Sequence, residues 1–310
     1  MRDAFVRAIL GLARADDRIF LITGDLGFGV LTEYWTTFPA QFVNAGVAEQ
    51  NMTGLATGLA LDGRTVFTYS IANFPTLRCL EQIRNDAAYH DADVKVVAVG
   101  GGFSYGALGM SHHATEDIAA LRAIPNVTVV VPGTVWEAER ATESLVAHRG
   151  TCYLRLDKSH GEEPADPPPF EIGRARRLRE GTDATIIAAG GILREAQEAA
   201  DTLADERIMC RVISMHTIKP LDLTEVKAAC RETGAVLTLE EHGAEGGLGS
   251  AVAEACMDCG VWPRRGARLA LRAGFSSIVG SQSYLRTQYG LDKHAVVRAV
   301  RQLLKTPQSK

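Results

Sequence analysis

The chain has 310 residues, of which 46% are hydrophobic and 23% are charged, and its formal net charge is -4. This composition is that of a soluble globular protein and excludes a disordered chain. A slightly acidic chain lacks the basic surface that nucleic acids or anionic membranes require, so we expect neither partner. Charged residues recur among the apolar positions of residues 1–20, which predicts an amphipathic helix rather than a signal peptide, and we expect a cytoplasmic protein.

Apolar runs that are rich in β-branched residues alternate with segments of helical period over most of the chain. In the first half, strands are expected at residues 18–25, 64–70, 94–100, 127–133 and 151–156. Nearly continuous apolar strands that are separated by helices predict a mostly parallel sheet with both faces covered. Residues 1–157 should therefore form one doubly wound α/β domain.

The alternation stops at residues 158–181, where prolines and charged residues are frequent and no period is sustained. We interpret this stretch as a linker, and the basic run "RARRLR" inside it as a solvated segment or an edge strand without a function. The pattern resumes with strands expected at 183–191, 210–215, 235–241 and 268–274. Residues 182–310 should form a second, smaller α/β domain that ends in an amphipathic helix.

The six cysteines are scattered along the chain, at positions 79, 152, 210, 230, 256 and 259. This spacing does not resemble a secreted disulfide framework, so reduced thiols are expected. The closest pair lies in "CMDC", whose spacing suits a redox motif or half of a metal site. The alanine-rich sequence around this pair, followed by Gly260, favours a plain helix end instead.

The sequence "NAGVAEQNM", residues 44–52, places the carboxylate of Glu49 after a small-residue turn, at the head of an apolar segment. An acidic residue in the first helical turn is favoured by the helix dipole alone. The alternative is a carboxyl group that handles a proton in an apolar setting. Gly54 and Gly58 give the same segment a flat face, which predicts close packing against another helix, with Glu49 at the rim of a subunit contact.

Two further stretches follow expected strands, at the sheet edge where parallel α/β sheets bind ligands. In "YSIANFPTLR", Tyr69 suits either the core or a ligand, whereas Phe74 lies at a strand-to-helix corner that suits stacking on a flat ring. The glycine-rich segment 100–117 lets backbone approach a ligand, and its His112 and His113 can donate hydrogen bonds or shuttle protons. No metal is expected there, because adjacent histidines point apart and no cysteine or carboxylate cluster completes a ligand set.

These stretches, followed by "TLEEHGAEGGLGSAVAE", resemble the C-terminal half of transketolase, which is a pyrimidine-binding domain plus a C-terminal domain. The resemblance covers nearly the whole chain. It implies a thiamine diphosphate-dependent enzyme that transfers a two-carbon ketol unit between sugars or sugar phosphates. Deoxyxylulose phosphate synthases and the beta subunits of oxo-acid dehydrogenases share this architecture, so a decarboxylating enzyme is the alternative. A non-catalytic scaffold is the third hypothesis, and the joint presence of Glu49, Phe74 and His112 argues against it.

By this resemblance, Glu49 contacts the N1′ nitrogen of the cofactor's aminopyrimidine and favours the imino tautomer that removes the thiazolium proton. The resemblance implies a protonated carboxyl buried among Val47, Ala48 and Met52. Phe74 stacks on the pyrimidine ring.

The same resemblance assigns His112, in "GMSH", to the family's GPTH motif, whose histidine faces substrate oxygens. The resemblance also places Asp25 near the cofactor, and it matches Arg155 and Arg2 to positions that hold a substrate phosphate, with a solvated chain terminus as the alternative for Arg2. From their places after expected strands, Tyr69 is assigned to the cofactor and His113 to the substrate. Two departures put an ordinary ketose phosphate in doubt. Leu108 stands where sugar-phosphate transketolases carry an aspartate, and a glycine of "VGGGFS" replaces an upstream histidine.

The family binds the cofactor's diphosphate through a metal, with a GDG motif and paired asparagines on a separate domain. This chain offers only "GDL" at 24–26 and Asn51, without the second glycine or the second asparagine. We therefore expect no metal site here. A separate N-terminal subunit should hold the diphosphate with Mg²⁺ or Ca²⁺, in an assembly of two copies of each chain.

Overall fold

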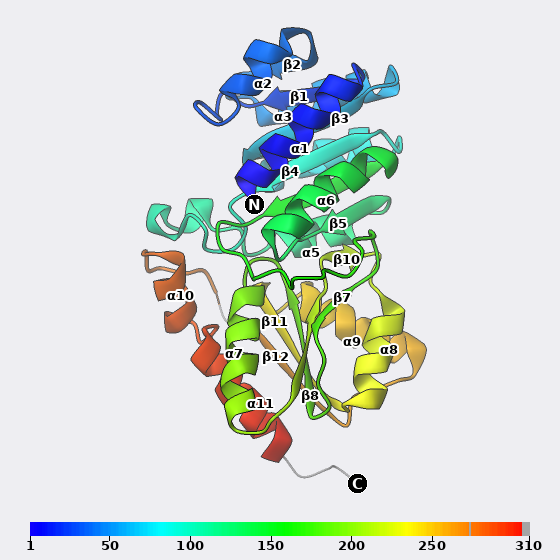
Figure 1. Cartoon of the computed structure of the whole chain (residues 1–310). Coiled ribbons are helices and arrows are strands. Elements are labelled where there is room, and N and C mark those ends of the chain that lie inside the picture. Colours follow the sequence, from blue (N-terminus) through cyan, green and yellow to red (C-terminus); the bar gives the residue numbers. More distant parts are fainter. Residues whose placement is uncertain (273, 306–310) are drawn as a thin grey trace.

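In the computed structural model, residues 1–272 and 274–305 are described, and two sheets with flanking helices lie one above the other (Figure 1). The first sheet has seven strands in the order β10-β5-β6-β4-β3-β1-β2. All its pairs are parallel except β10 with β5. The strands are β1 (Ile19–Thr23), β2 (Phe42–Asn44), β3 (Thr65–Ile71), β4 (Val94–Val99), β5 (Val127–Val130), β6 (Thr151–Leu156) and β10 (Thr217–Lys219).

Helices cover both faces of this sheet, as its continuous apolar strands require. One face packs against α1 (Arg2–Ala15), α2 (Thr32–Thr37) and α6 (Val135–Ala147). The other packs against α3 (Glu49–Leu61), η3 (Ile83–Ala88) and α5 (Asp117–Ala123). Shorter helical turns are η1 (Pro39–Gln41), η2 (Leu77–Cys79), α4 (Leu80–Gln82), η4 (Gly106–Leu108) and η5 (Met110–His112).

The second sheet has five strands in the order β12-β11-β8-β9-β7, with only β7 antiparallel to its neighbour. These are β7 (Arg176–Arg179), β8 (Ala184–Ala189), β9 (Cys210–Ser214), β11 (Ala235–Gly243) and β12 (Arg265–Leu271). On one face lie α7 (Leu193–Asp205) and α11 (Lys293–Lys305), and on the other α8 (Leu223–Glu232) and α9 (Leu248–Cys259). The short α10 (Gln282–Gln288) lies beside the boundary of the two domains.

Two strands depart from the expected domain organisation. β7 lies inside the stretch that was expected to be a linker, and it is an edge strand, one of the two possibilities left open for "RARRLR". Arg176 on β7 is buried, because its guanidinium pairs with Glu137 and Glu163 and lies over the Trp136 ring. β10 comes from the second half of the chain yet completes the first sheet.

The predicted two-domain α/β class is confirmed, and the expected apolar strands of both halves are present. The "CMDC" pair lies at the end of α9, where Gly260 adopts a left-handed φ of 63°, as expected for a plain helix end. All six cysteines lie in the described part of the chain and are free thiols.

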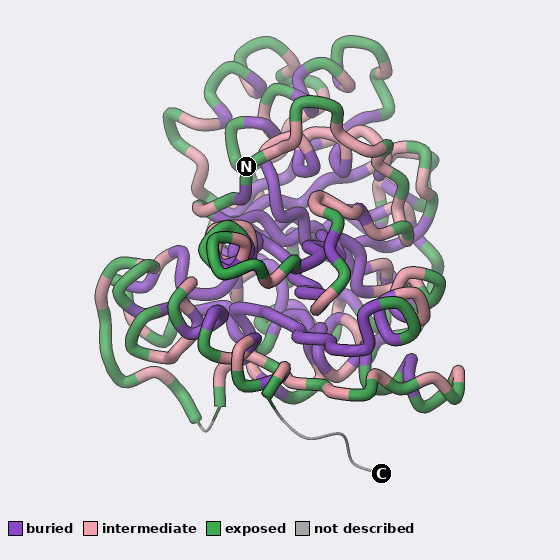
Figure 2. The backbone as a smooth tube through the Cα atoms, turned by 60° about the horizontal axis from the view of Figure 1, so that its bottom comes forward, coloured by how far each residue is buried: buried purple, intermediate pink, exposed green. Residues whose placement is uncertain are grey.

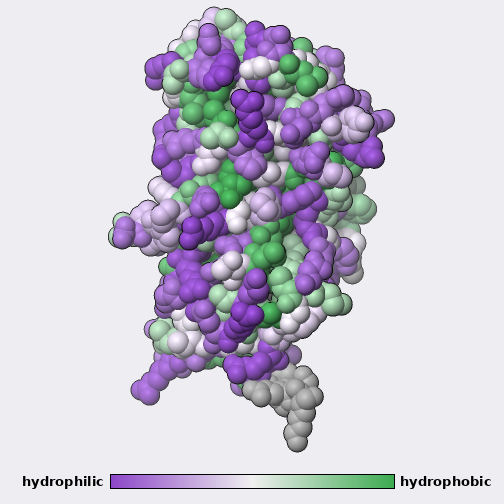
Figure 3. All heavy atoms as spheres, turned by 90° about the vertical axis from the view of Figure 1, so that its right-hand side faces the viewer, coloured by the Kyte–Doolittle hydropathy of each residue, from purple (hydrophilic) through white to green (hydrophobic). Residues whose placement is uncertain are grey.

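Buried residues lie in the interior of the molecule and exposed residues at its outside (Figure 2), and β4, β6 and β8 are buried along their whole length. One hydrophobic cluster continues from α3, η3 and α5 into α8 and α9, so the two domains share a core. On the face in Figure 3, hydrophilic side chains predominate and hydrophobic ones form small separate groups. Among the described residues, no helix has the length and apolar character needed to span a membrane.

Candidate active site

Glu49 begins α3, and its residue surface is only 3% exposed. Oε2 of its carboxylate accepts a hydrogen bond of 2.8 Å from Nη1 of Arg78. The stem of the side chain packs against the turn after β1, where a Cβ on Gly24 would lie 3.3 Å from Glu49 Cγ. The fold therefore holds one buried carboxylate at the carboxyl end of the parallel strands, the edge at which such sheets bind ligands.

The surroundings of Glu49 differ from the apolar setting that we expected. Met52 is buried, but Val47 is 75% exposed and Ala48 is also exposed. The reason is local: residues 46–48 form a tight turn, closed by a hydrogen bond of 2.7 Å from the Ala48 N–H to the Gly46 carbonyl. The buried charge is compensated by a cation, Arg78, rather than surrounded by apolar side chains.

Phe74 and His112 lie beside this ion pair. The guanidinium carbon of Arg78 lies 4.5 Å from the centroid of the Phe74 ring, while its Nη1 is bonded to Glu49. The His112 ring meets Phe74 edge-on, with centroids 5.3 Å apart and an interplanar angle of 70°. Three residues that sequence analysis selected are thus brought together, and Arg78, which it missed, fills the space between two of them.

His113 does not share the position of His112. It is buried, and its Nε2 donates a hydrogen bond of 3.2 Å to the Gly106 carbonyl. Its ring packs edge-on against Phe103, with centroids 5.0 Å apart. Asn73 Nδ2 donates to the His113 carbonyl at 2.7 Å. His113 is therefore a structural residue inside the loop, and the expectation that it contacts substrate is corrected.

Arg2 lines a cavity of about 240 Å³. The cavity walls are Met1, Arg2, Asp3, Val99, Gly100, Tyr105, Asp157 and Lys158. Nζ of Lys158 lies 3.9 Å from the Tyr105 ring centroid, and that ring lies 6.5 Å from the His112 ring. Burial lowers the pKa of the Lys158 ammonium. Two cations thus border one cavity next to the His112 loop; Lys158 was missed, although its position directly after a strand was a usable signal.

Arg155 is not available to a substrate phosphate, which corrects the sequence-based expectation. The residue is 2% exposed, and its Nε donates to Asp117 Oδ2 at 2.8 Å. Nη2 donates to the carbonyls of Ala114 and Glu241 at 2.7 Å and 3.1 Å. Asp117 and Ala114 belong to the first domain and Glu241 to the second, so this buried guanidinium joins the two domains.

Tyr69 belongs to the core rather than to the site. It is buried and stacks on Phe5, with centroids 5.8 Å apart and an interplanar angle of 15°. Burial raises the pKa of its phenol well above the ordinary value.

Asp25, which the resemblance places near the cofactor, is exposed. Its φ of 55° is left-handed, and its Oδ1 accepts a hydrogen bond of 3.1 Å from Asn44 Nδ2. The side chain closes the turn next to Gly24, so its expected place near the cofactor stays a prediction. Among the described residues, no group of three or more His, Cys, Asp or Glu side chains could hold a metal ion.

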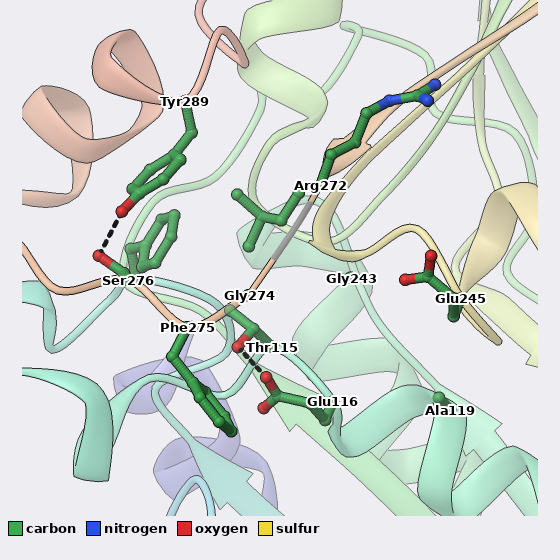
Figure 4. Close-up of a pocket in the computed structure, with 12 residues that line it drawn as sticks. Thr115, Glu116, Ala119, Gly243, Glu245, Arg272, Gly274, Phe275, Ser276 and Tyr289 are labelled. Carbon is green, nitrogen blue, oxygen red and sulfur yellow. Dashed lines mark hydrogen bonds between the residues drawn. The ribbon is translucent and has the colours of Figure 1, made fainter.

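A larger cavity, of about 380 Å³, is lined by Phe103 and by residues that include Thr115, Glu116, Phe275 and Tyr289 (Figure 4). It is bounded by the start of α5, the end of β11 and the segment after β12. Inside it the Tyr289 hydroxyl lies 2.7 Å from Ser276 Oγ, and Tyr289 stacks on Phe103 with centroids 5.4 Å apart. Neither Glu49 nor Phe74 lines this cavity, so it is separate from the candidate site.

Comparison with known families agrees with this arrangement. Residues 1–163 match the pyrimidine-binding domain of transketolase, and residues 173–296 match the transketolase C-terminal domain. This pair of domains defines a class of thiamine diphosphate-dependent transferases. The chain belongs to the transketolase family.

Several relatives match this chain from end to end. One of the apulose-4-phosphate transketolase subunits of Phocaeicola vulgatus is 36% identical, over 98% of this chain and 97% of that protein. The 6-deoxy-6-sulfo-D-fructose transketolase subunit SqwH of a Clostridium species is 36% identical, over 98% of this chain and 94% of that subunit. A solved structure described as a split gene transketolase, inactive beta4 tetramer, is 35% identical with a TM-score of 0.89. The match covers 98% of this chain and 97% of that chain. Transketolase-like protein 2 of Homo sapiens is 34% identical, but this chain covers only 47% of it.

Proposed function

We propose that this chain is the beta-type subunit of a split transketolase, and that thiamine diphosphate binds between it and a separate partner subunit. The observation that carries the proposal is a continuous set of contacts, in which Arg78 joins Glu49 to Phe74 and the Phe74 ring meets the His112 ring. The similarity in length to separately encoded subunits supports it. A deoxyxylulose phosphate synthase of Syntrophotalea carbinolica is 34% identical over 97% of this chain, so a decarboxylating enzyme is the second candidate function.

The residues present suit an aminopyrimidine. The Arg78 guanidinium is a flat group that donates to Glu49 and lies over Phe74, so it makes the two kinds of contact that a pyrimidine would make there. When bound, thiamine diphosphate supplies a thiazolium carbon that stabilises negative charge on the transferred unit. Glu49 would hold a proton at the ring nitrogen, and Phe74 would orient the ring and exclude water. Arg78 would have to leave this space.

His112 and the Arg2 cavity suit the substrate side. His112 is half-buried and can exchange hydrogen bonds with sugar oxygens. Arg2 and Lys158 would take the anionic end of the substrate, in place of the buried Arg155. The similar subunits are named for a sugar phosphate and a sulfo-sugar, and both substrates carry such an end.

The diphosphate and its Mg²⁺ or Ca²⁺ would be held by the partner subunit, because the sequence lacks the second glycine and the second asparagine of the family's metal-binding motifs. The exposed face of α3 around Gly54 and Gly58 would contact a second copy of the chain, in an α2β2 assembly. We place this assembly in the cytoplasm, as the sequence led us to expect.

Reconstitution tests the proposal directly. The chain is mixed with a subunit that carries the GDG motif and paired asparagines, and ketol transfer from apulose 4-phosphate and from 6-deoxy-6-sulfofructose is measured with Mg²⁺ and thiamine diphosphate. Transfer that needs both subunits is the expected result. Transfer by the chain alone would contradict the split site, and release of CO₂ from pyruvate without ketol transfer would support the decarboxylating alternative.

A further inference from the structure

The loop that carries Tyr105 and His112, residues 101–113, packs against residues of the second domain. Glu241, on β11, is 1% exposed, and its carboxylate points at the start of this loop. Oε1 accepts hydrogen bonds from the Phe103 N–H and, at 2.9 Å, from Gln282 Nε2. Oε2 accepts from Nε of Arg286. Both carboxylate oxygens are therefore engaged, one of them by the loop backbone.

A second carboxylate continues this network on the first domain. Asp157 Oδ1 accepts from the Ser104 hydroxyl at 2.8 Å and from the same Gln282 Nε2 at 2.9 Å. Arg286 Nη2 lies 3.9 Å from Asp157 Oδ2. We call Glu241, Asp157, Gln282 and Arg286 the loop clamp. Gln282 and Arg286, both on α10, lie between the two buried carboxylates. Glu241 accepts a hydrogen bond from Phe103 of the loop, and Asp157 accepts one from Ser104.

The loop backbone is also fitted sterically to the clamp. Gly102 has a left-handed φ of 59°, and a Cβ there would lie 2.3 Å from Glu241 Oε1. A Cβ on Gly106 would lie 2.6 Å from the Gly280 carbonyl, just before α10, and 2.5 Å from the Leu285 side chain. Contacts this close leave no room for a side chain, so the loop rests on the second domain at two separate points.

We infer that Glu241 is a positioning residue for the substrate-binding loop, and that substrate recognition by the first domain depends on this carboxylate of the second domain. The inference rests on the proposed function but goes beyond it, because it assigns a role in the reaction to a domain that carries none of the proposed catalytic groups. Charge-assisted hydrogen bonds in a buried setting are strong and directional, so they fix the loop backbone on which His112 depends. Glu49 lies on α3, outside the clamp.

Glu241→Gln tests the inference, because it keeps the size of the side chain but replaces one accepting oxygen by an amide donor, which then faces another donor. Three quantities are measured. Amide hydrogen exchange of residues 101–113 is followed in the chain by itself, and affinity for thiamine diphosphate and kcat/KM for ketol transfer are measured in the reconstituted complex. We expect faster loop exchange, a kcat/KM lower by about tenfold to hundredfold, and cofactor affinity within about twofold of wild type. The matched control is Glu245→Gln, an exposed carboxylate four positions further on, which should change none of the three.

Gln282→Ala is a second variant that weakens the clamp without altering either carboxylate. The test therefore still works if the Glu241→Gln variant fails to fold. Unchanged loop exchange and unchanged kcat/KM in both variants would overturn the inference. So would a parallel fall of cofactor affinity and melting temperature with kcat/KM, which is the mark of general destabilisation. The exchange comparison needs neither cofactor nor partner, so it separates failure of this inference from failure of the proposed function.

Discussion

Arg78 and Glu49 form an ion pair of 2.8 Å in which the two side chains differ sharply in exposure, at 46% and 4%. The buried carboxylate is fixed, whereas the arginine reaches it from the surface and lies over Phe74 on the way. An incoming pyrimidine would compete with Arg78 for both contacts.

Arg78→Ala should therefore tighten binding of thiamine diphosphate to the reconstituted complex. Partly exposed ion pairs contribute about 0.2 to 1 kcal/mol, so the dissociation constant should fall by at most about fivefold. Calorimetry measures it, with Arg84→Ala as the control for loss of an exposed arginine nearby. Weaker binding in Arg78→Ala would mean that the arginine itself holds the cofactor.

Glu49→Gln should keep the fold and much of the cofactor affinity but slow the loss of the thiazolium proton. A general acid-base group typically contributes about a hundredfold to ten-thousandfold. A mere helix-dipole role would cost only about 0.3 to 1 kcal/mol of stability and leave the reaction intact. Deuterium exchange of the thiazolium proton by NMR, with a melting curve, separates the two roles. Glu33→Gln, in the first turn of α2, is the matched control. Equal rates of thiazolium proton exchange in the two variants would mean that Glu49 only stabilises the start of its helix.

The isolated chain should bind thiamine diphosphate weakly and be inactive, because the ligands for the metal and diphosphate are expected on the partner. Addition of the partner subunit should restore both properties. Titration calorimetry with and without Mg²⁺ measures this, and tight, Mg²⁺-dependent binding to the chain alone would contradict it.

Gly58→Leu should disrupt assembly while leaving the single chain stable. A Cβ at Gly58 meets nothing within 4 Å, so the chain itself tolerates the side chain. Leucine in place of glycine even favours the helix by about 0.8 to 1 kcal/mol. Sedimentation of the reconstituted enzyme measures the assembly. Gly11→Leu, at an equally open position on α1, is the control, and normal assembly of both variants would refute the helix contact.

Lys158→Ala should raise KM for a substrate with an anionic end, because the ammonium borders the same cavity as Arg2. Loss of one hydrogen bond to a charged group costs about 1.5 to 3 kcal/mol, which is about tenfold to hundredfold in KM. Affinity for thiamine diphosphate should not change. Lys305→Ala, at the exposed end of α11, is the control, and an unchanged KM in Lys158→Ala would remove this residue from the site.

The sequence predicted the strands, because these follow from local pattern. The resemblance to transketolase placed Glu49, Phe74 and His112 in one site, and the contacts between Arg78, Phe74 and His112 agree with that placement. The sequence did not predict that Arg155 is buried and paired with Asp117, which lies 38 positions away. Such a pairing is set by how α5 packs against the first sheet, which no local pattern records. Tyr69 illustrates the same limit, since an aromatic residue near a strand end suits both the core and a ligand.

Arg78 and Glu241 were missed for a related reason. Each acts through a contact that is distant in sequence: 29 positions separate Arg78 from Glu49, and 138 separate Glu241 from Phe103. Lys158 was accessible to sequence reasoning, because it follows a strand end directly. The nearby Arg155 matched the family pattern and was chosen in its place.

β10 carries the chain back across the domain boundary, where it covers the outer edge of β5. A chain cut after the first domain would leave β5 with a row of unpaired backbone groups, which is the kind of edge that recruits strands from other molecules. Such a fragment should aggregate rather than fold. Because β10 pairs with β5 and one hydrophobic cluster spans both domains, binding studies call for the whole chain rather than the pyrimidine-binding half by itself.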